Sequence, residues 1–468
     1  MRLAAAAAII CICLFGTSFG QEPKYPFPQN ITYPHGILPT KRDAVTEMAK
    51  KWYSNWKNKY LQECNGNTRP GVDPLSRSLV EAQGFAMVPI AYMGDKALFD
   101  KMYNFYKSKC VSSACGLMDW KVTCSGVEAP GAATDGDVDV ACALLIAHWQ
   151  WPDAGYDEKL KALLTNLKKL ISSCGNLLVL HPGCGGGSPW GGCNETDLSY
   201  YAPAFFRYFA DISGDEQWNK LADDTQIIRD NGANAQTGLV PDWQSVEGRA
   251  GAGARVGYFA YDAIRAPYKQ TMDFLWHGTA KAETWCKKLT TWAHNSVGVR
   301  NIVDGYDLNG NKRGSNHNMA VLGSMAVAAM ANSQDILDAF VDETLTRTDG
   351  YWYSGYLGNL YLFALSGNMW NPDILRESAN RPVRAKAPAL MSGNLKVSLS
   401  VNHTIHLSGL PEAGTVSIVT LSGQTLFRSA ATGKSVSIDG SGLGSGCRIV
   451  KFSGESGRMN DQQMLLLP

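Results

Sequence analysis

Two kinds of helical segment alternate along most of this chain. Between residues 78 and 370, an apolar segment rich in small residues is followed each time by a more amphipathic one. A helix that is apolar nearly all round belongs in an interior, and one with a polar face belongs at the surface. The apolar segments begin near Ser78, Thr134, Thr196, Phe259, Asn316 and Tyr353, and the amphipathic ones near Asp95, Tyr156, Asp215, Ala280 and Asp335.

A further amphipathic helix, predicted over residues 42–61, completes a set of six pairs. Six inner and six outer helices of alternating direction form an (α/α)6 toroid, the fold that we predict for residues 40–380. In such a ring the N-terminal ends of the inner helices gather on one face. The connections on that face are long and rich in Gly, Trp and Tyr, and they comprise residues 111–133, 180–195 and 231–258. We expect the functional site there, because long loops carried by a scaffold are where sites are built.

The two ends of the chain differ from this repeat. One Arg, a short apolar core and small residues predict a secretory signal over residues 1–20, followed by an extended Pro-rich arm over 21–39. Residues 381–392 predict a linker, and residues 393–468 contain short alternating runs separated by Gly and Ser turns. This pattern predicts a small antiparallel β-sandwich. We therefore expect an exported protein, secreted or at the cell surface, with no membrane span.

The amino-acid composition limits the kinds of ligand that the protein is expected to bind. Charged residues make up 18% of the chain and the net charge is +1, so nothing favours binding to nucleic acid. The 13 Trp and 19 Tyr suit a sugar ligand, although aromatic residues are first of all core residues.

The cysteines leave two interpretations open. Export permits disulfides, but spacing does not determine the pairing. The cluster of Cys174, Cys184 and Cys193 near His181 is an alternative zinc site, although its spacings fit no standard pattern. Cys142 lies in an apolar segment and is predicted to be a buried free thiol. We expect no metal and no cofactor.

Three acidic residues, far apart in sequence, each stand at the start of an apolar helix: Glu81, Asp135 and Asp262. Any one of them alone could be a helix N-terminal carboxylate stabilised by the helix dipole. Together they favour a glycosidase, because glycosidic cleavage needs one protonated and one ionised carboxyl group on either side of the bond. Partial burial would keep Glu81 protonated.

Residues near these acids have predicted supporting roles. Arg265 could hold a carboxylate ionised or make a structural ion pair. Asp137 and Asp139 are expected to cap or brace neighbouring loops, and Asp273 to be a structural partner. The aromatic residues expected to bind sugar rings are Trp120, Trp190, Tyr200, Trp243, Tyr261 and Tyr356.

Four ordered motifs resemble those of glycoside hydrolase family 8. They are Glu81-Ala82-Gln83-Gly84, Ala133-Thr134-Asp135-Gly136-Asp137 with the apolar run to Trp151, Gly238-Leu239-Val240-Pro241-Asp242-Trp243, and Tyr261-Asp262-Ala263-Ile264-Arg265. Val140 stands where Ile or Met is usual, which is a conservative departure. The resemblance covers about residues 40–375.

The resemblance implies that Glu81 is the general acid, that Asp262 is the general base, and that Asp135 binds and distorts the central sugar. It also implies inversion of the anomeric configuration, with room for a water between acid and base. Asp rather than Asn at position 262 favours the subgroup that contains endoglucanases. Trp120 and Tyr261 match stacking positions of the family, and Trp190 matches less closely. We predict a secreted endo-β-1,4-glucanase acting on cellulose or a related glucan.

Several alternatives stay open. Within the family they are a chitosanase, a xylanase or a mixed-linkage β-glucanase; outside it they are a non-catalytic glycan-binding protein or a structural surface protein. Residues 414–424 and 443–452 resemble the C-terminal sorting domain of type IX secretion, which implies the secretion machinery as a partner. A purely structural sandwich or a small carbohydrate-binding module is the alternative for this tail, which contains no Trp and only two Phe.

Overall fold

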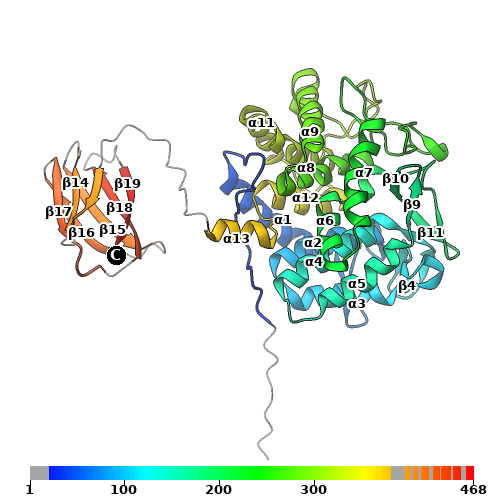
Figure 1. Ribbon diagram of the computed structural model, residues 1–468, viewed down its shortest axis with the longest axis horizontal. Helices are drawn as coiled ribbons and strands as arrows, with labels where there is room; N and C mark the ends of the chain where they lie inside the picture. The colour runs from blue at the N-terminus through cyan, green and yellow to red at the C-terminus, as the bar shows by residue number, and fades with distance from the viewer. Residues whose placement is uncertain are drawn as a thin grey trace, which may run out of the picture. The chain divides into compact units, whose positions relative to one another are not determined.

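The computed structural model describes residues 21–380 and, in the C-terminal region, residues 396–400, 404–408, 410, 413–420, 425–432, 434–443, 446–454 and 460–467. The predicted signal (1–20) and the predicted linker (381–392) lie outside the described residues. The chain divides into two compact units, residues 1–380 and 381–468, and each is described by itself (Figure 1).

The first unit is an (α/α)6 toroid, as predicted. Six helices buried on nearly all sides form its inner ring within residues 21–380: α2 (Val80–Met93), α4 (Thr134–Gln150), α6 (Pro203–Ser213), α8 (Ala266–His277), α10 (Met319–Ala328) and α12 (Trp352–Leu365). Six outer helices each bury one stripe: α1 (Arg42–Tyr60), α3 (Lys96–Ser108), α5 (Tyr156–Lys168), α7 (Gln217–Gly232), α9 (Ala280–Trp292) and α11 (Gln334–Thr344). A further helix, α13 (Pro372–Asn380), follows the ring (Figure 1).

Two glycines allow the inner helices α2 and α4 to approach closely. A Cβ atom on Gly136 would lie 2.2 Å from the carbonyl oxygen of Val80, and one on Gly84 would lie 2.7 Å from the carbonyl oxygen of Gly136. Only a residue without a side chain fits such a contact between backbones. Because Gly136 follows Asp135 and Val80 precedes Glu81, this contact brings the first turns of the two helices, and their carboxylates, together.

Short strands build the loops on the face where the inner helices begin. They are β1 (Leu61–Cys64), β2 (Asn67–Pro70), β3 (Arg77–Leu79), β4 (Cys110–Val111), β5 (Leu117–Met118), β6 (Lys121–Thr123), β7 (Val127–Ala129), β8 (Ala132–Ala133), β9 (Ile171–Cys174), β10 (Leu177–Leu180), β11 (Gly183–Gly185) and β12 (Ser188–Trp190). All their pairings are antiparallel.

Disulfides tie these loops together. The pairs are Cys64–Cys124, Cys115–Cys184 and Cys174–Cys193. The alternative zinc site is therefore wrong, because all three cysteines of that cluster are consumed in disulfides and none can supply a thiolate. Cys142 is buried and free, as predicted.

The N-terminal arm lies against the toroid. The Ile31 N–H donates to the carbonyl of Gly367 at 2.8 Å, and the Tyr33 hydroxyl donates to the carbonyl of Ala364 at 3.0 Å. No helix among the described residues combines the length and apolarity needed to cross a membrane.

The second unit is a small two-layer β-sandwich, as predicted. One antiparallel sheet contains β13 (Lys396–Leu399), β14 (Thr404–Ser408) and β17 (Ser435–Asp439), and the other contains β16 (Thr425–Ala431), β15 (Gly414–Thr420), β18 (Gly446–Gly454) and β19 (Asn460–Leu467). Side chains from both sheets form one core, among them Ile405, Leu407, Ile418, Val450 and Phe452.

Candidate active site

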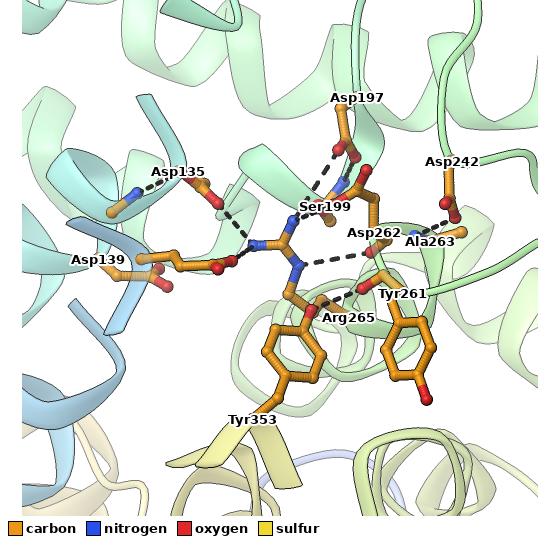
Figure 2. Close-up of polar contacts among 12 residues, drawn as sticks. Asp135, Asp139, Asp197, Ser199, Asp242, Tyr261, Asp262, Ala263, Arg265 and Tyr353 are labelled. Atoms are coloured by element: carbon orange, nitrogen blue, oxygen red, sulfur yellow. Dashed lines mark hydrogen bonds and ion pairs between the residues drawn. The ribbon is translucent and has the colours of Figure 1, made fainter. Parts of the chain in front are cut away.

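The three predicted carboxylates converge on one guanidinium. Arg265 Nη1 lies 2.6 Å from Asp135 Oδ2 and 3.3 Å from Glu81 Oε2, and its Nη2 lies 3.0 Å from Asp262 Oδ1. Figure 2 shows Arg265 between Asp135 on one side and Asp262 on the other. Glu81 stands in the first turn of α2, Asp135 in the first turn of α4, and Asp262 just before the short 3₁₀ turn (Ala263–Arg265) that leads into α8. The beginnings of three inner helices thus build one site.

The surroundings of Glu81 suit a carboxyl group that donates a proton. Burial raises the pKa of Glu81 to about 8, and the negative charges of Asp135 and Asp262 act in the same direction, against the opposing effect of Arg265. A carboxyl group with such a pKa carries its proton at neutral pH. Its side chain is nevertheless 22% exposed, so that the proton is accessible from solvent.

Asp262 is the most exposed of the three carboxylates. Its side chain is 35% exposed, against 3% for Asp135. Asp262 Oδ1 pairs with Arg265, and Oδ2 accepts a hydrogen bond from Trp243 Nε1 at 2.9 Å. Both oxygens of this carboxylate are therefore held by a donor. A solvent-accessible carboxylate in a fixed orientation is suited to take a proton from water.

The guanidinium also sets the spacing of the two groups. Glu81 contacts Nη1 and Asp262 contacts Nη2, so the planar fork stands between them. Their nearest oxygens therefore lie within about 9 Å of each other, an upper bound from the two contacts and the fork geometry. Inverting glycosidases hold their two carboxyl groups roughly 6.5–9.5 Å apart to admit a water and retaining ones about 5–5.5 Å, so this bound admits either spacing.

Asp135 is held firmly. Its Oδ1 accepts the N–H of Gly136 at 2.8 Å, and its Oδ2 accepts from Arg265. This carboxylate is buried and doubly anchored at the bottom of the cluster. Such a group can hold a sugar hydroxyl in one place.

Two further carboxylates belong to the cluster and were missed by the sequence reasoning. Asp197 Oδ2 lies 3.9 Å from Arg265 Nη2, and burial raises the pKa of Asp197 well above its usual range (Figure 2). Asp242 Oδ1 accepts the N–H groups of Ala260 and Ala263 at 2.7 and 2.8 Å, which fixes the backbone on both sides of Asp262. The sequence contained a sign of both residues. Asp197 is an acid shortly before an inner helix, like the other three, and Asp242 lies within the motif Gly238–Trp243.

Asp137 braces a neighbouring loop as predicted, whereas Asp139 does not: it joins the inner helices α4 and α8. Asp137 accepts hydrogen bonds from the Tyr106 hydroxyl at 2.5 Å and from the Met118 N–H at 3.2 Å, and so joins α4 to α3 and β5. Asp139 pairs with Lys269 at 2.8 Å. Asp273, which is also buried, pairs with Arg207 at 3.0 Å.

The predicted aromatic residues divide into two groups. Trp120 and Tyr261 are exposed, at 39% and 37%, and present rings to solvent. Trp190 stacks on Trp243 with 6.2 Å between ring centroids, and Tyr200 meets Trp243 edge-on at 5.9 Å. Trp243 and Tyr200 are almost completely buried, so only an edge of each is available to a ligand.

The prediction that Tyr356 binds substrate is wrong. Its side chain is fully buried, and its hydroxyl donates to the carbonyl of Gly71 at 2.9 Å. Its ring packs against Trp56 and Tyr60 of α1, at 5.3 and 5.5 Å between centroids. The residue lies on the side of α12 that faces the outer helix, away from the cleft.

Tyr261 is anchored by contacts that the sequence did not reveal. Its hydroxyl donates to Asp304 Oδ2. Figure 2 shows the second contact, in which the Tyr353 hydroxyl donates to the backbone carbonyl of Tyr261 at 2.5 Å. Asp304 also accepts the N–H groups of Ser315 and Asn316, both at 3.0 Å. The ring beside Asp262 is thus tied to the loop before α10.

In the described part of the chain, no group of three or more His, Cys, Asp or Glu side chains could hold a metal ion.

Comparisons with known proteins identify the family of this chain. The model of the family "Glycosyl hydrolases family 8" matches residues 25–367. The chain is 35% identical to Endoglucanase 2 of Ruminiclostridium josui over 66% of this chain and 68% of that protein. It is 32% identical to Endoglucanase A of Acetivibrio thermocellus over 81% of this chain and 82% of that protein.

A solved structure has the same fold. The β-1,3-1,4-glucanase of a Paenibacillus species superposes with a TM-score of 0.68 at 26% identity, covering 75% of this chain and all of that one.

Proposed function

Because the chain belongs to glycosyl hydrolases family 8 and is therefore a glycoside hydrolase, we propose that it is an endo-β-1,4-glucanase that inverts the anomeric configuration. The observation that carries this proposal is the cluster around Arg265. A largely buried carboxyl with a pKa of about 8 and a more exposed carboxylate flank one guanidinium. This is the pairing of acid and base that glycosidic cleavage requires.

The proposed reaction uses three side chains. The protonated carboxyl of Glu81 donates its proton to the glycosidic oxygen as the bond from that oxygen to the anomeric carbon breaks. A water attacks the anomeric carbon from the opposite face and passes a proton to Asp262, so the product has the inverted configuration. Asp135 holds a hydroxyl of the central sugar and favours its distortion toward the oxocarbenium shape. Exchange with solvent then returns the proton to Glu81 and removes one from Asp262.

The choice of cellulose or a related β-1,4-glucan as substrate rests on the relatives. Both curated relatives described above are named endoglucanases, and they match over two thirds or more of their length. A mixed-linkage β-glucan is the second candidate, because the solved structure at 26% identity is a β-1,3-1,4-glucanase. Reducing-sugar release from carboxymethylcellulose, lichenan, xylan and chitosan separates these substrates.

Two substitutions test the roles. Glu81→Gln and Asp262→Asn should each lower kcat by at least about 100-fold while the fold is kept, because each removes one partner of the acid–base pair. Glu283→Gln, which removes a surface carboxylate paired with Lys287, is the matched control. NMR of the first-formed anomer should show inversion. Retained hydrolysis in either active-site variant, or a retained anomer, would contradict the proposal.

We propose further that the protein is exported. The signal-like segment supports this, and so do three disulfides, which form and persist in oxidising compartments. In this proposal the C-terminal sandwich is a type IX sorting domain whose partner is the secretion machinery. Comparing secretion of the full chain with that of a chain lacking residues 393–468 tests the second point. Equal export of both would contradict it.

A further inference from the structure

The indole N–H of Trp243 points at the proposed base. Its Nε1–H donates to Asp262 Oδ2 at 2.9 Å, while Arg265 Nη2 lies 3.0 Å from Oδ1. The sequence predicted Trp243 as a sugar-binding ring, yet its side chain is only 7% exposed. A ring with so little free surface has no open face for a sugar.

Neighbouring side chains hold this ring in place. The guanidinium of Arg255 lies 4.8 Å from its centroid, Trp190 stacks on it, and Tyr200 meets it edge-on. Arg255 is itself fixed, because its Nε pairs with Glu195 at 2.5 Å. A ring packed in this way keeps one rotamer.

The backbone of Trp243 is equally constrained. Its N–H donates to the carbonyl of Val256 at 3.0 Å, and its carbonyl accepts the N–H of Gly251 at 2.9 Å. The backbone and the ring of Trp243 are therefore both fixed, and the indole N–H points in one direction. By contrast, an aspartate side chain that is 35% exposed is free to turn about its last bond unless a partner holds it.

We propose that Trp243 is a positioning residue for Asp262, and that its indole N–H holds the carboxylate in the orientation that receives the proton of the attacking water. The inference rests on the proposed role of Asp262. With Oδ2 held by the indole and Oδ1 by Arg265, the plane of the carboxylate is defined at two points.

Several ionisable groups face Asp262 and influence the pH dependence of any variant. They are Arg265 beside it, Glu81 from α2, Asp197 and Tyr200 from the turn before α6, Asp242 from the preceding loop and Tyr353 from α12. A substitution of Trp243 leaves all of them in place. The comparison of the variant with the wild type therefore reports the loss of the N–H donor.

The test removes the N–H and keeps a ring. In Trp243→Phe, kcat should fall by about 10- to 100-fold, the range that corresponds to a hydrogen bond to a charged group. KM should change less than threefold, so that the effect appears in kcat. A second variant replaces the indole by benzothienylalanine, in which sulfur takes the place of the N–H while both rings stay. It should show the same loss.

The matched control is Trp285→Phe. The Trp285 indole N–H donates to a backbone carbonyl, that of Gly238, at 2.8 Å, so this variant loses a buried indole hydrogen bond of equal kind away from the carboxylates. Its kcat should stay as in the wild type.

The outcomes separate this inference from the proposed function. If both Trp243 variants kept wild-type kcat, or changed KM alone, Trp243 would not position the base and the inference would fall. If Asp262→Asn kept hydrolysis, the proposed function would fall instead, whatever the Trp243 variants did.

Discussion

Substituting Arg265→Met tests the arrangement of the whole site. Arg265 is buried and lies within ion-pair distance of four carboxyl groups, those of Glu81, Asp135, Asp197 and Asp262. Methionine fills a similar volume but leaves these groups without their cation. We expect kcat/KM to fall by at least about 100-fold, because acid and base both lose their position.

The same substitution should destabilise the protein in a pH-dependent way. Removing one partner of a buried ion pair costs about 3–5 kcal/mol. For a unit of this size that corresponds to a Tm lower by about 4–7 °C, from the usual unfolding entropy per residue. Burial raises the pKa of Glu81 to about 8 although Arg265 lowers it, so without the cation the folded protein holds this proton to still higher pH. The loss should therefore grow as pH rises above about 8 and be smaller below it.

The assay compares reducing-sugar release and thermal unfolding at several pH values. Arg207→Met is the control, since Arg207 also pairs with a buried carboxylate, Asp273, on the far side of α8. It should lower Tm and leave kcat/KM within twofold of the wild type. Wild-type activity in Arg265→Met, or a loss no larger than in Arg207→Met, would refute this account of the site.

Four further predictions concern single side chains. Because burial raises the pKa of Glu81 to about 8, the alkaline limb of the pH–rate profile should lie near pH 8; a limb below pH 6 would contradict that role for Glu81. The folded protein holds this proton more tightly than the unfolded chain, so stability should fall from about pH 4.5 to 8, and Glu81→Gln should flatten this dependence of Tm on pH. Tyr356→Phe, which loses one buried hydrogen bond, should cost about 1 kcal/mol in chemical denaturation and leave hydrolysis unchanged. Asp304→Asn should raise KM several-fold with kcat nearly kept, because Tyr261 loses its anchor; steady-state kinetics in which kcat fell instead would contradict this.

Much of the architecture could be predicted from local patterns. Hydrophobic periodicity separates inner from outer helices because burial on all sides and burial on one side leave different residue patterns. The acids at positions 81, 135 and 262 stood out because each lies at, or just before, the start of an apolar helix. A charged side chain is unusual there unless it has a structural or functional role. The order of the four motifs indicated the family, and the match of the family model over residues 25–367 confirmed it.

What the pattern could not decide was which way a side chain points. Tyr356 and Tyr261 both lie near the start of inner helices, but one packs on α1 and the other reaches the cleft. Trp243 carried a motif position, yet only its packed surroundings reveal that its N–H meets a carboxylate. Disulfide pairing was equally beyond the sequence, since spacing along a chain does not measure distance in space.

The sequence by itself therefore determined the elements, their order and the chemical kinds of residue at the site, because these follow from local composition and periodicity. The tertiary structure alone decided that one guanidinium gathers four carboxyl groups, which of them is buried and which is open to water. Burial and charge neighbours set the proton affinity of each carboxyl, and both depend on residues more than a hundred positions apart that only folding brings together.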